Sequence, residues 1–165
     1  MPPDLLLRRG RRLEYFTIAC NSLEAVVALV AGFLAGSIAL VGFGFDSLIE
    51  VTSGGALLWR LHHGERAERL ALRLVGSCFV VLAVYVAYES AEALLSRRAP
   101  QRSLPGILLA MASLLVMPLL ARAKRLVGTS LNSAAMHADA RQTEFCTWLS
   151  AILLGGLLLN ALLGW

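Results

Sequence analysis

The sequence predicts an all-α fold, a polytopic transmembrane helix bundle with five membrane helices in this chain. Its composition indicates a lipid environment: 58% of the 165 residues are hydrophobic, 16% are charged, and the mean hydropathy is +0.70. Soluble domains carry about 25% charged residues, so this chain has too few charges to cover a soluble core. The second observation is that the apolar residues come in long blocks.

Five of these blocks are long enough to cross a bilayer. A membrane span needs about 20 mainly apolar residues, and inside lipid it must be helical to satisfy its own backbone hydrogen bonds. The expected helices cover about 13–35, 38–61, 68–96, 104–123 and 131–163. They form one transmembrane domain, 13–165, which follows a basic cytoplasmic N-terminus at 1–12.

The basic residues cluster in the connections between these helices. Eleven are expected on the side of the N-terminus, including Arg122, Lys124 and Arg125 before the fifth helix, and three on the opposite side. By the positive-inside rule the N-terminus is cytoplasmic, in a multi-pass protein of the cell (inner) membrane. Topology therefore explains the net charge of +4, and no nucleic-acid partner is expected.

Small residues predict close helix packing near the start of the chain. The two-residue connection Gly36–Ser37 predicts a tight hairpin between the first two helices. The second helix is the richest in glycine, and small residues let membrane helices approach closely. We therefore expect this helix in the middle of the bundle.

Two acidic residues on the second helix are the first candidates for a functional site. Asp46 and Glu50 are four residues apart, so both carboxylates lie on one helix face. A charge in the membrane costs roughly 2.5–3.5 kcal/mol on insertion scales, and two like charges repel unless a cation or a proton lies between them. Carboxylate oxygens suit divalent cations, and nitrogen or sulfur ligands shift the preference toward zinc-like metals.

Two other interpretations of this pair remain open. Asp46 or Glu50 could form an ion pair with a buried arginine, for which Arg73 and Arg141 are the nearby candidates. Alternatively, the pair could relay protons without binding a metal.

A second polar cluster lies at the start of the fifth helix. Asp139, Gln142 and Cys146 are spaced three and four residues apart, so they share one face. Facing the second helix, they would supply a carboxylate, an amide oxygen and a thiolate. The alternative is that Asp139, Arg141 and Glu144 form the solvated start of a long helix.

Asn21 and Glu24 on the first helix either form hydrogen bonds between helices or support the site from a distance. No arrangement of a nucleophile beside a base suggests an enzyme, and no resident cofactor is expected.

The run from Gly36 to Glu50 resembles the second transmembrane helix of the cation diffusion facilitator (cation efflux) transporter family. That helix carries a D-x-x-x-D motif in the family and D-x-x-x-E here. The resemblance continues through Arg122–Ser133 and Ala138–Cys146 and covers nearly the whole chain.

The resemblance implies a tetrahedral zinc-type site between the second and fifth helices, proton-coupled export by an antiporter, and a homodimer. The family's usual H-x-x-x-D motif on the fifth helix falls on Gln142 and Cys146. The chain therefore resembles a divergent short branch that lacks this motif, and it has five expected helices where the family has six.

Together these observations predict a membrane transporter of divalent, zinc-like transition-metal cations, working by proton-coupled efflux. Its expected partners are the transported cation, such as Zn²⁺, protons, the lipid bilayer and a second copy of the chain. The alternative is a non-transporting structural or regulatory membrane module whose buried acids form ion pairs. The expected metal ligands are Asp46, Glu50, Asp139, Gln142 and Cys146.

Overall fold

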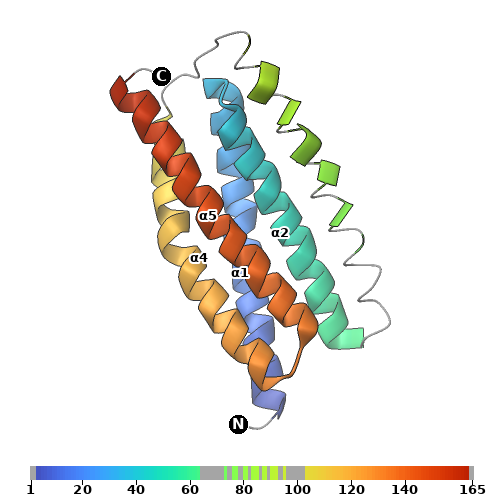
Figure 1. The fold of residues 1–165 in the computed structure, drawn as a ribbon. Coiled ribbons are helices and arrows are strands. Elements are labelled where there is room, and N and C mark those ends of the chain that lie inside the picture. Colours follow the sequence, from blue (N-terminus) through green and yellow to red (C-terminus); the bar gives the residue numbers. More distant parts are fainter. Residues whose placement is uncertain are drawn as a thin grey trace.

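The computed structural model describes residues 3–63 and 103–163, together with single positions between 73 and 95. Within this part of the chain every element is a helix (Figure 1): α1 (Pro3–Ala35), α2 (Ile38–His63), α4 (Leu104–Ser130) and α5 (Ala134–Leu163). The positions between 73 and 95 are helical as well, but most of the expected third helix lies outside the described residues. The prediction of an all-α bundle is confirmed.

The four labelled helices form a ring in which each packs mainly on two neighbours. α1 packs against α2 and α4, and α5 packs against α4 and α2. Their long axes run up and down the molecule, and α5 crosses obliquely in front of α1 (Figure 1). Among these four helices α2 packs on α1 and α5, and its Phe45 ring also lies against Tyr85 of the described positions between 73 and 95. The expectation of a central α2 stays a prediction, because most of the expected third helix lies outside the described residues. The glycines of α2 differ in their surroundings: an added Cβ at Gly44 would lie 2.8 Å from Leu29 of α1, whereas one at Gly55 would meet nothing within 4 Å.

A tight hairpin joins α1 to α2, as the sequence predicted. Gly36 adopts a left-handed φ of 61°, and the Ser37 N–H donates to the Gly32 carbonyl at 2.9 Å. This is the Schellman arrangement, in which a residue in the left-handed region ends a helix. The Ser37 hydroxyl then accepts from the Leu40 N–H at 3.4 Å and caps the start of α2.

The hairpin between α4 and α5 repeats this construction with different residues. Asn132 has a φ of 48°, the Ser133 N–H donates to Gly128 at 3.0 Å, and the Ser133 hydroxyl caps Met136 at 3.3 Å. α4 consequently runs to Ser130, beyond the expected end at 123, and α5 begins at Ala134. The segment expected to be a basic connection is therefore helical. At the other end of the chain, α1 begins at Pro3, well before the expected start near 13.

The surface and the interior are arranged as in a membrane protein. Three described helical segments are long and apolar enough to cross a bilayer: Asp4–Ala35, Leu104–Ser130 and Ala134–Leu162. α2 is not among them, and it carries the buried acids Asp46 and Glu50. Large apolar side chains such as Leu34 and Leu115 point outward, whereas many polar side chains are buried. Apolar side chains on the outside and polar side chains inside are expected for a helix bundle surrounded by lipid.

Candidate functional site

All four described helices turn a polar stripe toward the interior of the bundle. The residues of each stripe lie on one helix face, most of them three or four positions apart and those of α4 eleven, which is about three turns. On α1 the stripe consists of Glu14, Thr17, Asn21 and Glu24, all buried. The other stripes are Asp46, Ser47 and Glu50 on α2, Ser113 and Lys124 on α4, and Asp139, Gln142, Thr143, Cys146 and Ser150 on α5.

The buried charges are very unequal in sign. Among the described residues, five carboxyl groups and one ammonium group are buried: those of Glu14, Glu24, Asp46, Glu50, Asp139 and Lys124. Removing a charge from water costs several kcal/mol unless it is paired, so one lysine leaves most of these carboxylates uncompensated. Protons or a bound cation must offset the remaining negative charge.

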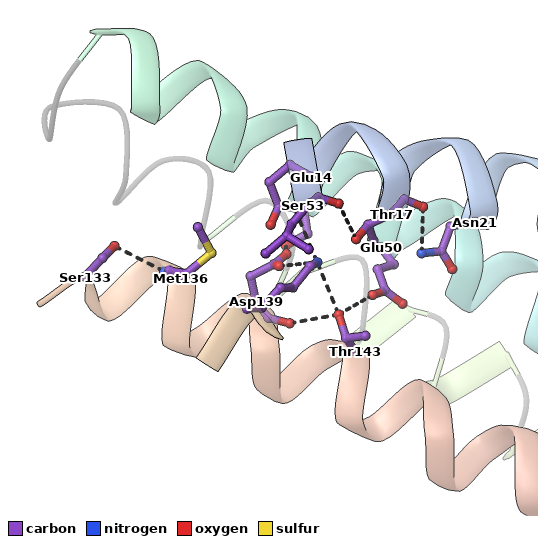
Figure 2. A network of polar contacts seen from close by, with 11 residues as sticks. Glu14, Thr17, Asn21, Glu50, Ser53, Ser133, Met136, Asp139 and Thr143 are labelled. Carbon is purple, nitrogen blue, oxygen red and sulfur yellow. Dashed lines mark hydrogen bonds and ion pairs between the residues drawn. The ribbon is translucent and has the colours of Figure 1, made fainter. Parts of the chain in front are cut away.

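Lys124 is the centre of one polar cluster. Its Nζ forms ion pairs with Asp139 Oδ2 and, at 3.3 Å, with Glu14 Oε2, and it donates to Thr143 Oγ1 at 3.2 Å. The Ser53 hydroxyl donates to Asp139 Oδ1 at 3.5 Å. Figure 2 shows Glu14, Ser53 and Asp139 converging in this region from three helices. We call Glu14, Lys124 and Asp139 the ionic cluster.

Glu50 lies next to this cluster without joining it by an ion pair. The Thr143 hydroxyl donates to Glu50 Oε1 at 2.5 Å, and the two side chains point toward each other (Figure 2). The Cys146 thiol lies close enough to the Glu50 carboxyl for electrostatic interaction. Glu50 Oε2 is buried and has no hydrogen-bond partner.

The remaining buried acids lie on the other side of Glu50. The Ser47 hydroxyl donates to Glu24 Oε2 at 3.4 Å, which places Glu24 of α1 against the acidic face of α2. Asp46 and Glu24 are both close enough to Glu50 for electrostatic interaction. In the described ranges the ion pairs involve Glu14, Asp139 and the surface residue Glu144, and none involves these three acids. We call Glu24, Asp46 and Glu50 the acidic cluster.

The five residues predicted as metal ligands are all buried, but they divide between these clusters. Glu50 and Cys146 lie close enough for electrostatic interaction, and Asp46 is one helical turn from Glu50 on α2. Gln142 is buried with an unpartnered Nε2, whereas Asp139 belongs to the ionic cluster. Among the described residues, no three His, Cys, Asp or Glu side chains are grouped closely enough to hold a metal ion. A complete set of ligands is therefore not assembled in this conformation.

The buried basic residue that pairs with acids in the structure is not one of the two arginines expected from the sequence. Arg73 and Arg141 are exposed, and among the described residues the buried cation is Lys124, which was expected in the connection before the fifth helix. Helical spacing could have identified it, because Met117, Lys124 and Val127 lie on one buried face of α4. The solvated-start interpretation applies to Arg141 and Glu144, which are exposed, but not to Asp139, which is buried.

Glu14 was not predicted either. It lies one residue beyond the expected start of the first membrane helix, although it is in step with Thr17, Asn21 and Glu24. That regular spacing was the available signal.

Apolar outer faces around a carboxylate-rich interior define a multi-pass membrane protein built to receive positive charge. The family model described as the cation efflux transmembrane domain matches residues 15–164. The chain belongs to the cation efflux family, whose members transport metal cations, so the resemblance seen in the sequence is confirmed. No solved structure matches the chain.

Proposed function

We propose that this protein transports a divalent, zinc-like transition-metal cation in exchange for protons. The observation that carries the proposal is Glu50 Oε2, a buried carboxylate oxygen without a partner. A buried charge that is neither paired nor hydrogen-bonded is costly, and a cation at this oxygen would remove the cost. The neighbouring acids Asp46 and Glu24 add negative charge to the same region.

The proposed ligands are Asp46, Glu50, Gln142 and Cys146. Four donors match the tetrahedral coordination typical of zinc, and a thiolate beside carboxylates favours a borderline-soft metal over Mg²⁺ or Ca²⁺. Glu50 and Cys146 lie near each other, and no three Asp, Glu, Cys or His side chains are grouped among the described residues, so the proposed ligands need to move closer together when the cation binds. A transporter must also release its cation. A site whose ligands come together only when the cation binds is compatible with that release.

Asp139 has a different role in this proposal from the one first expected. Both of its carboxylate oxygens are engaged, Oδ2 by Lys124 and Oδ1 by Ser53. Withdrawing Asp139 to bind cargo would leave Lys124 with one fewer counter-charge in a buried position. We therefore assign Asp139 to the ionic cluster and not to the ligands.

Proton coupling follows from the same surplus of buried acids. When the cation leaves, Asp46, Glu24 and Glu50 lose its charge, and protons are the available replacement. Metal binding to carboxylate and thiol ligands releases protons, so cation and protons alternate at one site. The family resemblance supports efflux and a homodimer, and the basic residues support a cytoplasmic N-terminus in a cell (inner) membrane.

The alternative function, a non-transporting module with paired acids, rests on the ionic cluster. Lys124 does pair with Glu14 and Asp139, as that alternative requires. It leaves the acidic cluster unexplained, because Arg73 and Arg141 are exposed. Transport accounts for both clusters.

Zinc flux into proteoliposomes tests the proposal. Asp46→Ala and Glu50→Ala should each lower the initial rate of Zn²⁺ transport by at least about tenfold, since each removes a proposed ligand. Glu144→Ala is the matched control, because that carboxylate is exposed and paired with Arg125 at the surface. An imposed pH gradient should drive Zn²⁺ flux in the wild type.

Two outcomes would contradict the proposal. Wild-type flux in both alanine variants would remove the site, and absence of flux from folded wild-type protein would favour the non-transporting alternative.

A further inference from the structure

One hydroxyl group connects the ionic cluster to the acidic cluster. Thr143 is fully buried on α5, next in sequence to the proposed ligand Gln142. Its Oγ1 lies 2.5 Å from Glu50 Oε1, toward which it points in Figure 2, and 3.2 Å from Lys124 Nζ. Among the described residues, no other side chain forms hydrogen bonds with both Glu50 and Lys124.

The direction of these two hydrogen bonds follows from chemistry. An ammonium group only donates, so the Thr143 oxygen accepts from Lys124. The hydroxyl then has one proton to donate, to Glu50 Oε1 at 2.5 Å or to the Asp139 carbonyl at 3.3 Å. A carboxylate is the stronger acceptor and here the nearer one, so the proton belongs to the bond with Glu50.

Lys124 is fixed by its own counter-charges and does not move freely toward Glu50. Glu14 from α1 and Asp139 from α5 both pair with it, and Ser53 from α2 supports Asp139. The ammonium therefore acts on Glu50 through Thr143, whose hydroxyl it polarises. Chains of hydrogen bonds strengthen one another in this way.

We propose that Thr143, supported by Lys124, is a positioning residue for the transported cation. Thr143 holds one oxygen of Glu50 and leaves the other, Oε2, directed at the cargo. This inference rests on the proposed function, in which Glu50 is a ligand. Ligating carboxylates are commonly oriented by hydrogen bonds of this kind, and loss of such a partner typically weakens metal binding about 10–100-fold.

The test compares three substitutions on one helix. Thr143→Val keeps the shape of the side chain and removes the hydroxyl, whereas Thr143→Ser keeps the hydroxyl and removes a methyl group. Thr147→Val is the matched control, because the Thr147 hydroxyl only donates to the Thr143 carbonyl one turn away, at 3.2 Å. Initial rates of Zn²⁺ uptake into proteoliposomes, measured over a range of free Zn²⁺, give KM and the maximal rate for each.

Thr143→Val should raise KM for Zn²⁺ about tenfold or more. Its maximal rate, and both kinetic parameters of Thr143→Ser and Thr147→Val, should stay within about twofold of wild type. Equilibrium titration of Zn²⁺ into purified protein that elutes as a single species in detergent should show the same ranking of affinities. If Thr143→Ser keeps the wild-type KM, the effect of Thr143→Val comes from loss of the hydroxyl that orients Glu50 and not from altered packing of the threonine methyl group.

Two results would overturn the inference: an unchanged KM in Thr143→Val, or equal impairment of Thr143→Ser and Thr143→Val. Glu50→Gln, tested in parallel, distinguishes this from failure of the proposed function. If Glu50→Gln transports normally, the proposed site is wrong. If Glu50→Gln is inactive and Thr143→Val keeps the wild-type KM, only the positioning role is wrong.

Discussion

Lys124 and Arg125 are neighbours in sequence with opposite environments. Lys124 is fully buried between two carboxyl groups, whereas Arg125 and its partner Glu144 are half exposed, at 50% and 47%. Breaking a buried pair leaves an uncompensated charge and costs about 3–5 kcal/mol, while an exposed pair contributes about 1 kcal/mol or less. Adjacent residues of similar chemistry thus make very different contributions to stability.

This contrast gives a prediction. Lys124→Met should lower the free energy of unfolding in detergent by about 3 kcal/mol or more, because Glu14 and Asp139 lose their shared counter-charge. Arg125→Met, the control on the same helix, should change it by less than about 1 kcal/mol. Adding Glu14→Gln to Lys124→Met should recover part of the loss. Equal effects of the two single substitutions would argue against the ionic cluster.

Cys146 determines the expected metal preference. It is fully buried near Glu50, and its thiolate would be the one soft ligand in the proposed set. Cys146→Ser should weaken Cd²⁺ and Zn²⁺ binding by at least about tenfold, while Mn²⁺ binding changes less because Mn²⁺ prefers oxygen ligands. Competition titrations of the three ions measure this, and equal losses for all of them would remove Cys146 from the site.

At the scale of elements, two glycines differ in the space around them: Gly32 lies at a close helix contact and Gly55 does not. A Cβ at Gly32 would lie 2.8 Å from a methyl group of Val41 and 2.9 Å from its backbone nitrogen, across the α1–α2 contact. At Gly55 of α2 it would meet nothing within 4 Å. The two positions therefore form a matched pair for testing how the hairpin packs.

Gly32→Ala should destabilise the protein by about 1–3 kcal/mol, because the backbone of α2 cannot easily move away. Gly55→Ala should be neutral or stabilising by up to about 1 kcal/mol, since alanine favours helix. Thermal unfolding of both variants in detergent checks the ranking. A reversed ranking would mean that α1 and α2 pack differently from the structure.

The two hairpins show which helix ends can be predicted from sequence. Gly36 is a strong signal because glycine adopts left-handed φ values without strain, and the end of α1 was predicted correctly. Asn132 does the same at the end of α4, but asparagine is common in many other settings, so the expected fifth helix ran through it. The expected start near 13 and the expected end near 123 were placed where the apolar residues begin and stop. Hydrophobicity indicates which residues lie in the bilayer, but a helix can extend beyond them.

For the whole molecule, periodicity predicted much of the polar interior. The shared face of Asp46 and Glu50, and that of Asp139, Gln142 and Cys146, are both buried in the structure. Lys124 and Glu14 were missed because charged residues near the expected end of a membrane helix are usually solvated. Their burial depends on packing against other helices, and a hydropathy profile carries no information about that packing.

The surplus of buried acids also predicts how the whole bundle responds to cargo. A ligand that binds only the folded protein stabilises it by about 2.7 kcal/mol at a free concentration one hundred times its Kd. Zn²⁺ should therefore raise the unfolding temperature of the wild type, and the shift should be lost in Asp46→Ala and in Glu50→Ala. Mg²⁺ is the control ion, and an equal shift in the variants would place the binding elsewhere.

The short connection between α1 and α2 has a consequence for how the protein is made. α2 carries two buried carboxyl groups, those of Asp46 and Glu50, and charged residues make the entry of a helix into lipid costly. Since only Gly36 and Ser37 separate it from α1, α2 leaves the ribosome while α1 is still at the translocon. The two can then enter the bilayer as one helical hairpin, with Ser47 and Glu24 already facing each other. Membrane integration of α2, in this view, is assisted by its neighbour, which covers part of its acidic face.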